Sequence, residues 1–351
     1  MFKKIFDKKH RSRTISYLIV VLAYIVLELL VKTDGISSRF KSLLVPTTCY
    51  IVVAIALNMV VGISGELSLG HAGFMCVGAF TGVCVGGLLS NTINSNILIL
   101  VIAIIAGTIV AGLCGLLISV PVLKLEGDYL AIVTLAFCQI IQSLIMNVYI
   151  GFDSNGLHFS FVEKKFELLE NGKFLLEGPM GASGTNRIAN FTAGVILIII
   201  ALVVAYNLIY SRNGRAIMAA RDNRIAATSI GINVVKVKTL IFVISACLAG
   251  AAGALYSLNY STLTASKFDF NLSILILVYV VLGGLGNITG TIIATTALIL
   301  IPELLRQIAD YRLIIYSIIL IATMLITNNQ KMKKIIQEIK DKLKSRNKEK
   351  K

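Results

Sequence analysis

Charged residues are scarce in this chain. Only 15% of its 351 residues are Asp, Glu, Lys or Arg, whereas a soluble globular chain carries roughly 25%. The few charges cluster outside long apolar runs, and 56% of the residues are hydrophobic, with a mean hydropathy of +0.85. Folding in water would leave too much apolar surface exposed. The composition therefore excludes a soluble globular protein and favours a bilayer.

The chain also has little that could carry catalysis or hold a metal. Two of its three histidines, His10 in the basic N-terminus and His158 in a polar loop, lie far from any nucleophile or metal partner in sequence. All six cysteines lie in apolar runs without a CxxC pair, as expected of small buried hydrophobes rather than of a zinc site or a disulfide framework. No GxxxxGK[ST] loop is present to bind nucleotide phosphates. We expect a non-catalytic protein without cofactor or metal.

Positive charge is concentrated in three segments. The net charge of +15 is the sum of +5 in residues 1–13, +5 in residues 211–238, +7 in residues 328–351 and −2 elsewhere. Basic segments that flank apolar spans are typical of the cytoplasmic side of a membrane protein. A nucleic-acid-binding protein would need a basic face on a soluble domain, and the chain has no soluble stretch of that size.

Apolar runs of about 20 residues recur along the chain, each long enough to cross a bilayer. The first run, Thr14–Lys32, is longer than the apolar region of a signal peptide and no small-x-small cleavage site follows it, so we expect a retained helix. Ten transmembrane helices are predicted, near residues 14–32, 43–61, 74–90, 97–119, 129–148, 191–210, 239–258, 272–288, 290–305 and 311–327.

Ten spans place both termini on one side, and their basic character makes that side the cytoplasm. Residues 1–13 are then a basic cytoplasmic N-terminus, and residues 14–327 are the transmembrane domain. Within it, residues 149–190 form an external loop and residues 211–238 a cytoplasmic loop. Residues 328–351 are a basic cytoplasmic tail. The external loop is long enough for some structure of its own, either to receive a partner or as a plain cap.

Two glycine-rich segments interrupt the helical pattern, Gly62–Gly73 and Gly283–Gly290. Helices broken at similar places in two halves of a chain indicate a transport site, because unpaired backbone groups survive in a membrane only where they line a cavity. The alternative is tight helix packing through small residues. The fold class that follows is an all-α integral membrane protein with broken helices.

Several sequence motifs occur in a fixed order. They are Asn58–Phe74 followed by Gly78-Ala-Phe80, Gly127–Phe137, Ser211–Asn233, Val281–Gly286 and Tyr311-Arg312. Together they resemble the permease subunits of branched-chain amino acid ABC transporters, over about residues 15–327. The resemblance is nearest to the larger permease of the leucine/isoleucine/valine type. The family's Thr-Gly-Gly stretch after the fifth helix is missing, and only Asn155-Gly156 remains of it.

This resemblance implies a type II ABC importer permease fold in a bacterial plasma membrane. The subunit would form half of a translocation pathway. The implied partners are a sister permease, cytoplasmic ABC ATPases that hydrolyse ATP, and an extracellular or periplasmic solute-binding protein, together with membrane lipid. The implied solute is a branched-chain or similar amino acid. The alternatives are a permease for a urea-like amide, a nucleoside or a sugar.

The cytoplasmic loop carries the candidate ATPase-coupling residues. Residues 216–229 are rich in Ala with Arg and Asp, which predicts one short amphipathic helix, and Gly231 fits its C-terminal cap. Such a helix can lie in a groove of an ATPase and transmit its motion; the alternative is a surface helix on anionic lipid. The candidates are Arg215, Arg221, Asp222, Arg224, Ala226, Ala227 and Gly231.

Glu66 and His71 flank the first glycine-rich break and are expensive at membrane depth, so both are candidates for the pathway. The Glu66 carboxylate could bind the ammonium group of an amino acid. Helix N-terminal amides and serine hydroxyls could bind the carboxylate of the same amino acid. The alternative is a position at the cytoplasmic interface, in water. Gln139, which shares a helix face with Gln142, either lines the pathway or bonds to a neighbouring helix. The pathway candidates are Asn58, Ser64, Glu66, Ser68, His71 and Gln139.

Two other classes of protein remain as competitors. A secondary transporter or channel that works without ATP would need several buried charges as an ion or proton relay, and the apolar runs contain few. A membrane-embedded enzyme would need a catalytic pair or metal ligands at membrane depth, and the sequence offers neither.

Overall fold

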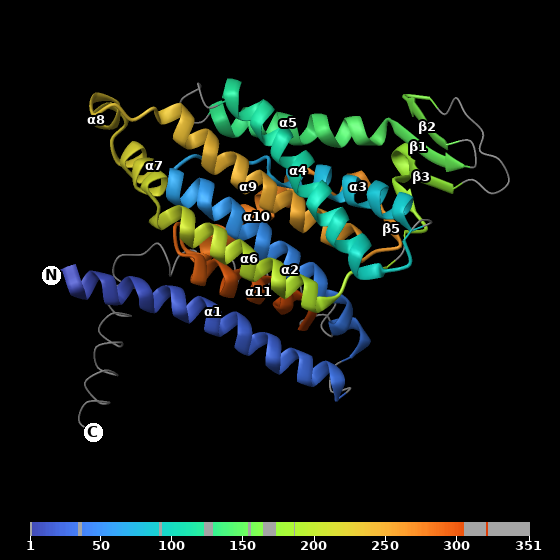
Figure 1. Cartoon of the computed structure of the whole chain (residues 1–351), viewed down its shortest axis with the longest axis horizontal. Helices are drawn as coiled ribbons and strands as arrows, with labels where there is room; N and C mark the ends of the chain where they lie inside the picture. Colours follow the sequence, from blue (N-terminus) through green and yellow to red (C-terminus); the bar gives the residue numbers. More distant parts are fainter. Residues whose placement is uncertain are drawn as a thin grey trace. The chain divides into compact units, whose positions relative to one another are not determined.

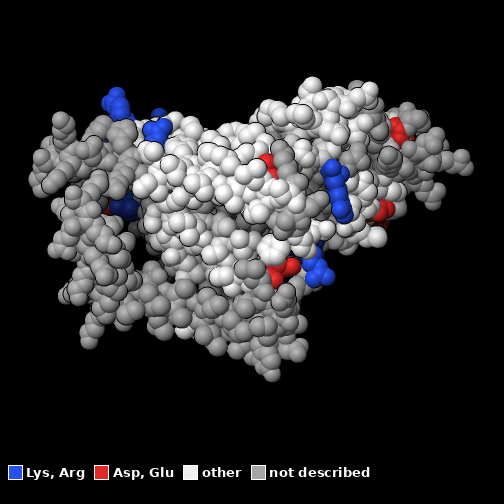
Figure 2. All heavy atoms as spheres, turned by 90° about the horizontal axis from the view of Figure 1, so that it is seen from below, with Lys and Arg blue, Asp and Glu red and all other residues white. Residues whose placement is uncertain are grey.

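The computed structural model describes residues 2–33, 37–90, 93–122, 129–153, 156–163, 173–185, 187–304 and 321. Within these ranges, eight helical segments are long and apolar enough to cross a membrane, and the apolar segment Ile288–Glu303 is shorter. The predicted tenth span, residues 311–327, lies outside the described residues. Residues other than Lys, Arg, Asp and Glu form most of the described surface in Figure 2. The prediction of an all-α integral membrane protein is confirmed.

The chain divides into two compact units, residues 1–295 and residues 296–351. The first unit contains almost all of the described helices and is the one that we describe. Its helices, with α11 running on past the boundary, are α1 (Phe2–Lys32), α2 (Ser38–Asn58), α3 (His71–Leu89), α4 (Asn96–Val122), α5 (Tyr129–Met146), α6 (Phe191–Tyr210), α7 (Arg212–Asp222), α8 (Arg224–Ser229), α9 (Val234–Ser257), α10 (Phe270–Gly283) and α11 (Ile288–Leu304).

The long helices of the first unit run side by side in alternating directions, which creates two ends (Figure 1). At one end lie α7, α8 and the start of α9, and we call it the α7 end. At the other end lie the strands described below, and we call it the sheet end. The N-terminal half of α1 belongs to the α7 end, because Ser16 bonds to Tyr206 and Thr289, while Tyr24 lies beside Thr192 nearer the sheet end.

Helix α9 is the centre of the bundle and packs most extensively against α3 and α4. Its sequence repeats small residues every four positions, and so do the facing stretches of its partners. A Cβ added at Gly78 of α3 would collide with the backbone of Gly250 on α9, and one at Gly250 would collide with Ala111 and the Gly107 backbone on α4. Small residues allow this close approach of backbones, which supplies the van der Waals contact that holds helices together in lipid.

The loop between α6 and α9 contains two short helices instead of the one predicted. Asn223 has extended backbone angles (φ −154°, ψ 104°) and ends α7, and its side-chain oxygen accepts from the Ala226 N–H to begin α8. An asparagine at this place favours the cap over continuation of a helix. The predicted end at Gly231 is confirmed: with φ +84°, it allows the Gly231 and Ile232 N–H groups to donate back to Thr228 and Ala227.

The loop predicted to be external contains a small antiparallel sheet in the order β2-β1-β3. Its strands are β1 (Val148–Asp153), β2 (Gly156–Phe161) and β3 (Lys173–Glu177). After a 3-10 turn (Gly178–Met180), β4 (Ala182–Ser183) pairs with β5 (Thr262–Leu263), which lies between α9 and the 3-10 turn Ala265–Lys267. Strand β1 begins almost directly after α5, so the sheet continues outward from the end of that span (Figure 1).

Candidate functional site

The two glycine-rich segments meet at the α7 end. The first begins as a π-helical extension of α2, Met59–Ser64, and ends where α3 starts at His71. The second is the turn between α10 and α11, in which Gly284 and Gly286 have positive φ. Asn58 joins them: its Oδ1 accepts from the Gly286 N–H at 2.7 Å, and its Nδ2 donates to the Thr291 hydroxyl at 2.7 Å.

Backbone contact at this junction is very close. A Cβ placed on Gly62 would collide with both the Asn58 side-chain oxygen and the Gly286 nitrogen. The segments are therefore turns packed against each other, with no lining of an open cavity between them. Of the two interpretations of the glycine-rich breaks, the structure favours tight packing through small residues.

His71 lies inside the bundle, with 1% of its surface exposed. Its Nε2 lies 2.6 Å from the Ser245 hydroxyl, which itself donates to the Ala56 carbonyl, so Nε2 is assigned as the donor to Ser245. Nδ1 is then free to accept from the Ser68 hydroxyl at 3.3 Å. A neutral His71 thus links the start of α3 to α9 and α2.

The start of α3 is capped by side chains of other helices. The Leu69 N–H donates to the Thr134 hydroxyl on α5, and the Ala72 N–H donates to the Ser273 hydroxyl on α10. These bonds satisfy amide groups that a helix N-terminus would otherwise leave unpaired, so the amides are not free for a solute carboxylate. Four predicted pathway residues are buried within the first unit, namely Asn58, Ser64, Ser68 and His71.

Glu66 forms an ion pair with Lys238, in the first turns of α9. The side chains are 16% and 11% exposed, so the pair is largely removed from solvent. Both residues lie at the α7 end, beside the basic loop. The partner of Glu66 in the structure is thus a lysine, whereas the alternative predicted for it was an interface position satisfied by water. A role of Glu66 in the pathway stays a prediction.

Arg221, a predicted coupling residue, turns toward the body of the protein. Its Nη1 donates to the Gly62 carbonyl at 3.0 Å, and its Nε and Nη2 donate to Asp222 Oδ1 at 3.0 and 2.9 Å. Its aliphatic stem covers Gly65. Arg215 donates instead to the Tyr210 carbonyl, at 3.2 Å on an exposed face. Among the remaining candidates, Asp222 and Ala226 are exposed, Arg224 is half-buried, Ala227 is buried against Ala220 and Val234, and Gly231 forms the turn.

Two isoleucines on this loop were not among the sequence candidates. Ile225 on α8 is 79% exposed, and Ile230 at its end is 75% exposed. They lie at the tip of the loop, surrounded by polar residues. Large apolar side chains this exposed at a polar surface are typical of an anchor for a partner. The sequence did contain a signal for them, because Ile225 and Ile230 are large apolar residues among the polar residues of this loop.

Gln139, the last pathway candidate, lies on α5 and is half-buried. Helix α5 exposes one long face, which includes Ile132, Ile140 and Leu144 but also Ser143, and the exposed Asn147 follows where the helix ends. Helix α4 exposes mainly aliphatic side chains, such as Ile105, Ile109 and Leu113, and its exposed polar residue Asn96 is the first residue of the helix. Polar groups on the exposed face of a spanning helix indicate that something other than lipid covers it.

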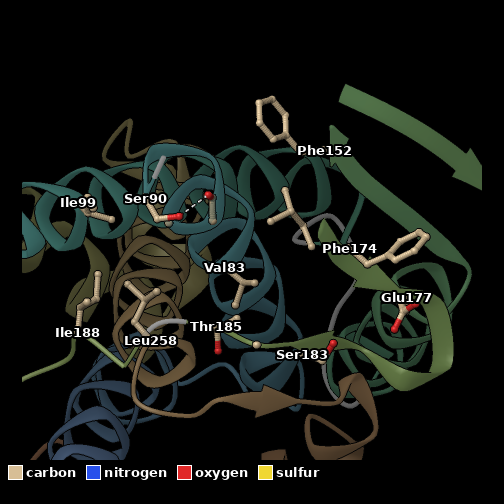
Figure 3. Close-up of a pocket in the computed structure, with 14 residues that line it drawn as sticks. Val83, Ser90, Ile99, Phe152, Phe174, Glu177, Ser183, Thr185, Ile188 and Leu258 are labelled. Atoms are coloured by element: carbon tan, nitrogen blue, oxygen red, sulfur yellow. Dashed lines mark hydrogen bonds between the residues drawn. The ribbon is translucent and has the colours of Figure 1, made fainter. Parts of the chain in front are cut away.

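A cavity of about 390 Å³ lies at the sheet end (Figure 3). One wall is apolar and comes from the end of α3, the start of α4 and the end of α9, with Val83, Ile99 and Leu258. The far side comes from β1 and β3, with Phe152, Phe174 and Glu177, and a polar edge comes from β4 and the segment that follows, with Ser183 and Thr185. The cavity therefore combines an aliphatic wall with one carboxylate, away from all of the sequence candidates.

Behind this polar edge, hydrogen bonds hold the segment between β4 and α6 to the segment between α9 and α10. The Thr185 hydroxyl donates to the Tyr260 carbonyl, and the Thr185 N–H donates to the Ser261 carbonyl at 3.2 Å. Burial raises the pKa of the Tyr260 phenol above its ordinary value, so this ring stays neutral. Ser183 and Thr185 are thus uncharged groups of the lining, and Glu177 is its charged residue.

A bundle of apolar helices, with a polar loop at one end and a cavity at the other, defines a multi-pass membrane protein of the permease class. Residues 40–327 match the family described as branched-chain amino acid transport system / permease component. The chain belongs to that family, as its motifs predicted.

The chain is also similar to individual permeases. It is 32% identical to the high-affinity branched-chain amino acid transport system permease protein LivM of Salmonella typhimurium over 234 residues, which cover 62% of this chain and 53% of the relative. Identity to LivM of Escherichia coli is 32% over 238 residues, covering 63% and 54%. The fructose import permease protein FruG of Bifidobacterium longum is 23% identical over 204 residues, covering 56% of each chain.

The chain thus spans about half the length of the LivM relatives that it matches. No solved structure matches it.

Proposed function

We propose that this chain is the membrane-spanning permease subunit of an ATP-driven importer of branched-chain amino acids. The observation that carries the proposal is its membership of a permease family along residues 40–327. The polar loop of α7 and α8 adds a surface suited to an ATPase. ATP hydrolysis then takes place on a separate chain, since the sequence has no phosphate-binding loop.

The α7 end is the cytoplasmic end in this proposal. Ile225 and Ile230 are the anchors that enter a groove of the ATPase, and Arg215, Asp222 and Arg224 surround them with charge. The support is the exposure of both isoleucines beside charged residues on one short loop. Apolar anchors within a polar rim are the usual composition of a binding hot spot.

The exposed face of α5 is the wall that this subunit contributes to the pathway, opposite a sister permease. The support is the set of polar side chains along a face that is otherwise apolar, with Gln139 at its edge. The aliphatic faces of α1 and α4 face lipid instead. Substrate then arrives at the sheet end from an external binding protein.

A second solute class is favoured by one specific observation. The relatives include a permease whose name gives fructose as its import substrate. A sugar is therefore the alternative solute within the same mechanism. Since the identity to that relative is 23% and that to the LivM proteins is 32%, we favour a branched-chain amino acid.

The test is affinity purification of the tagged full-length chain from its native membranes in mild detergent, followed by mass spectrometry of the proteins that remain bound. We expect a cytoplasmic ATPase and a second permease. Ile225→Ser with Ile230→Ser should reduce ATPase recovery at least tenfold, whereas the exposed neighbour Ser229→Ala should leave it unchanged. Recovery of the chain without any ATPase in several detergents would contradict the proposal.

Uptake measurements then identify the solute. Cells that carry the intact system should accumulate radiolabelled leucine, isoleucine and valine, and cells that lack this chain should not. Uptake of fructose, with no uptake of these amino acids, would move the assignment to the sugar class.

A further inference from the structure

Arg221 connects the coupling loop to the end of α2. The π-helical segment Met59–Ser64 ends here, and the last carbonyl groups of a helix have no partner within it. Arg221 donates to one of these, the Gly62 carbonyl, at 3.0 Å, and places its positive charge at the negative end of the helix dipole. Its stem packs on Gly65, where φ is +75°.

The same short stretch of backbone is held on its opposite side. Gly62 lies against Gly286, and Asn58 one turn earlier binds both the Gly286 N–H and the Thr291 hydroxyl. Thr291 in turn donates to the Asn287 carbonyl at 3.1 Å. A continuous series of contacts therefore runs from α7, through Gly62 and Asn58, to the turn between α10 and α11.

A second tether joins this stretch to α9. Glu66 follows the π-helical segment directly and pairs with Lys238, four residues after α9 begins at Val234. Helices α7 and α9 are thus both attached to residues 62–66, one through a guanidinium and the other through an ammonium. As long as the Arg221 contact is intact, a displacement of α7 therefore also moves residues 62–66.

We propose that Arg221 and Asn58 are positioning residues that transmit movement of the coupling loop to the two glycine turns. This rests on the proposed function, because an ATPase must supply the movement. The Arg221 side chain is 39% exposed, but its role in this proposal is the bond to Gly62 within the permease and not contact with the ATPase. Asn58 belongs to the same relay and not to the solute-binding surface.

The first experiment compares ATP hydrolysis with leucine uptake in proteoliposomes that contain the complete purified transporter. Arg221→Met keeps the stem and removes the donors, so we expect normal ATPase recovery and hydrolysis but at least a tenfold fall in leucine transported per ATP. Arg212→Met, on the same helix and exposed, is the matched control and should change this ratio less than twofold.

Thr291 provides a second, milder pair of variants. Thr291→Val keeps the shape and removes the hydroxyl that binds Asn58, so it should also lower the ratio, by about threefold to tenfold. Thr291→Ser retains the hydroxyl and should keep the wild-type ratio. This pair remains informative if Arg221→Met does not assemble.

Backbone hydrogen exchange of the complex, with and without ATP and vanadate, gives a readout that a merely structural role would not alter. In the wild type, nucleotide should change exchange in α7, in residues 62–66 and at the Gly286 amide together. In Arg221→Met it should change exchange in α7 alone.

The outcomes separate the two proposals. Loss of ATPase recovery in Arg221→Met, or a coordinated exchange response that survives it, would overturn the relay while the permease assignment stands. Failure of the wild-type chain to recover an ATPase would overturn the proposed function itself.

Discussion

The two ends of the first unit are built differently. At the α7 end, side chains cross from one helix to the backbone of another: Asn58 to Gly286, Arg221 to Gly62 and Ser245 to Ala56. At the sheet end, short strands and turns together with the ends of α3, α4 and α9 surround a cavity of about 390 Å³. The α7 end is thus closely packed around residues 58–66, and the sheet end contains open space.

This difference has a physical consequence for transport. Closely packed elements transmit a displacement because their interior has no free volume to absorb it. A cavity bordered by strands and turns can change shape or take up a small molecule with less disturbance of its neighbours. The α7 end is suited to transmission of force, and the sheet end, which is the external end in the proposed function, to exchange of molecules. Equal substitutions at the two ends should therefore have unequal effects.

Gly62→Ala should have the largest effect on stability. The new Cβ would occupy the positions of the Asn58 oxygen and the Gly286 nitrogen, so the bond between them must break and the packing must open. We expect a loss of about 3 kcal/mol in the free energy of unfolding, measured by titration with SDS in mixed micelles. Gly184→Asn at the sheet end is the control, because Gly184 (φ +70°) has open space around it and Asn tolerates that conformation. A loss at Gly184 equal to that at Gly62 would contradict the comparison.

The Glu66–Lys238 ion pair should give the next largest effect. Lys238→Met leaves the Glu66 carboxylate without its partner in a site where it is only 16% exposed. Loss of one member of a buried pair costs about 3–5 kcal/mol, and because this pair retains some exposure we expect about 2 kcal/mol. Glu66→Gln should cost a similar amount, as measured in the same titration.

The double variant Glu66→Gln with Lys238→Met provides the control for that interaction. Since each single change leaves the other group unpaired, the double variant should lose less than the sum of the two, by about 1 kcal/mol or more. Strict additivity would show that the two side chains act independently.

Much of the fold follows from the sequence, and the reasons are local. Nine of the ten predicted spans fall on described helices, because a run of about 20 apolar residues has few other stable states in lipid. The sheet was missed, although Leu157, Phe159 and Phe161 alternate with smaller or polar residues along β2, because these short strands lie in a loop of mixed charge between two long apolar runs. The split at Asn223 depends on a single capping side chain. A prediction that sums helix propensity over the whole loop does not detect it.

The candidate site was less predictable because it depends on contacts between distant segments. The sequence marked Asn58, Glu66, His71 and Arg221 as unusual, and each does have a specific role in the structure. However, Arg221 binds Gly62, 159 positions away, and Asn58 binds groups that are 228 and 233 positions away, which no local pattern reveals. Without knowledge of those partners, a buried polar side chain that joins helices looks the same as one that meets a solute.

Asn223→Ala should have a smaller and more local effect. It removes the cap that accepts from the Ala226 N–H, which is worth about 1 kcal/mol. Because α8 contributes little to the core, we expect faster hydrogen exchange of the amides in residues 224–230 rather than a change in global unfolding. Thr228→Ala, an exposed change on the same helix, should leave their exchange nearly unaltered. Equal effects of the two variants would show that the Asn223 cap does not hold α8 in place.

The smallest effect should come from added volume at the sheet end, and one substitution made twice tests it. Ser183→Val adds its methyl groups beside the cavity on a strand, where β-branched residues are favoured, so we expect a change within about 0.5 kcal/mol. Ser245→Val at the α7 end removes the hydroxyl that donates to Ala56 and pairs with His71, and leaves two buried groups unsatisfied. That variant should lose about 2 kcal/mol in the same mixed-micelle titration. Equal losses of unfolding free energy in the two variants would show that side chains cannot use the space at the sheet end. The two ends would then differ in their hydrogen bonds but not in how freely their side chains pack.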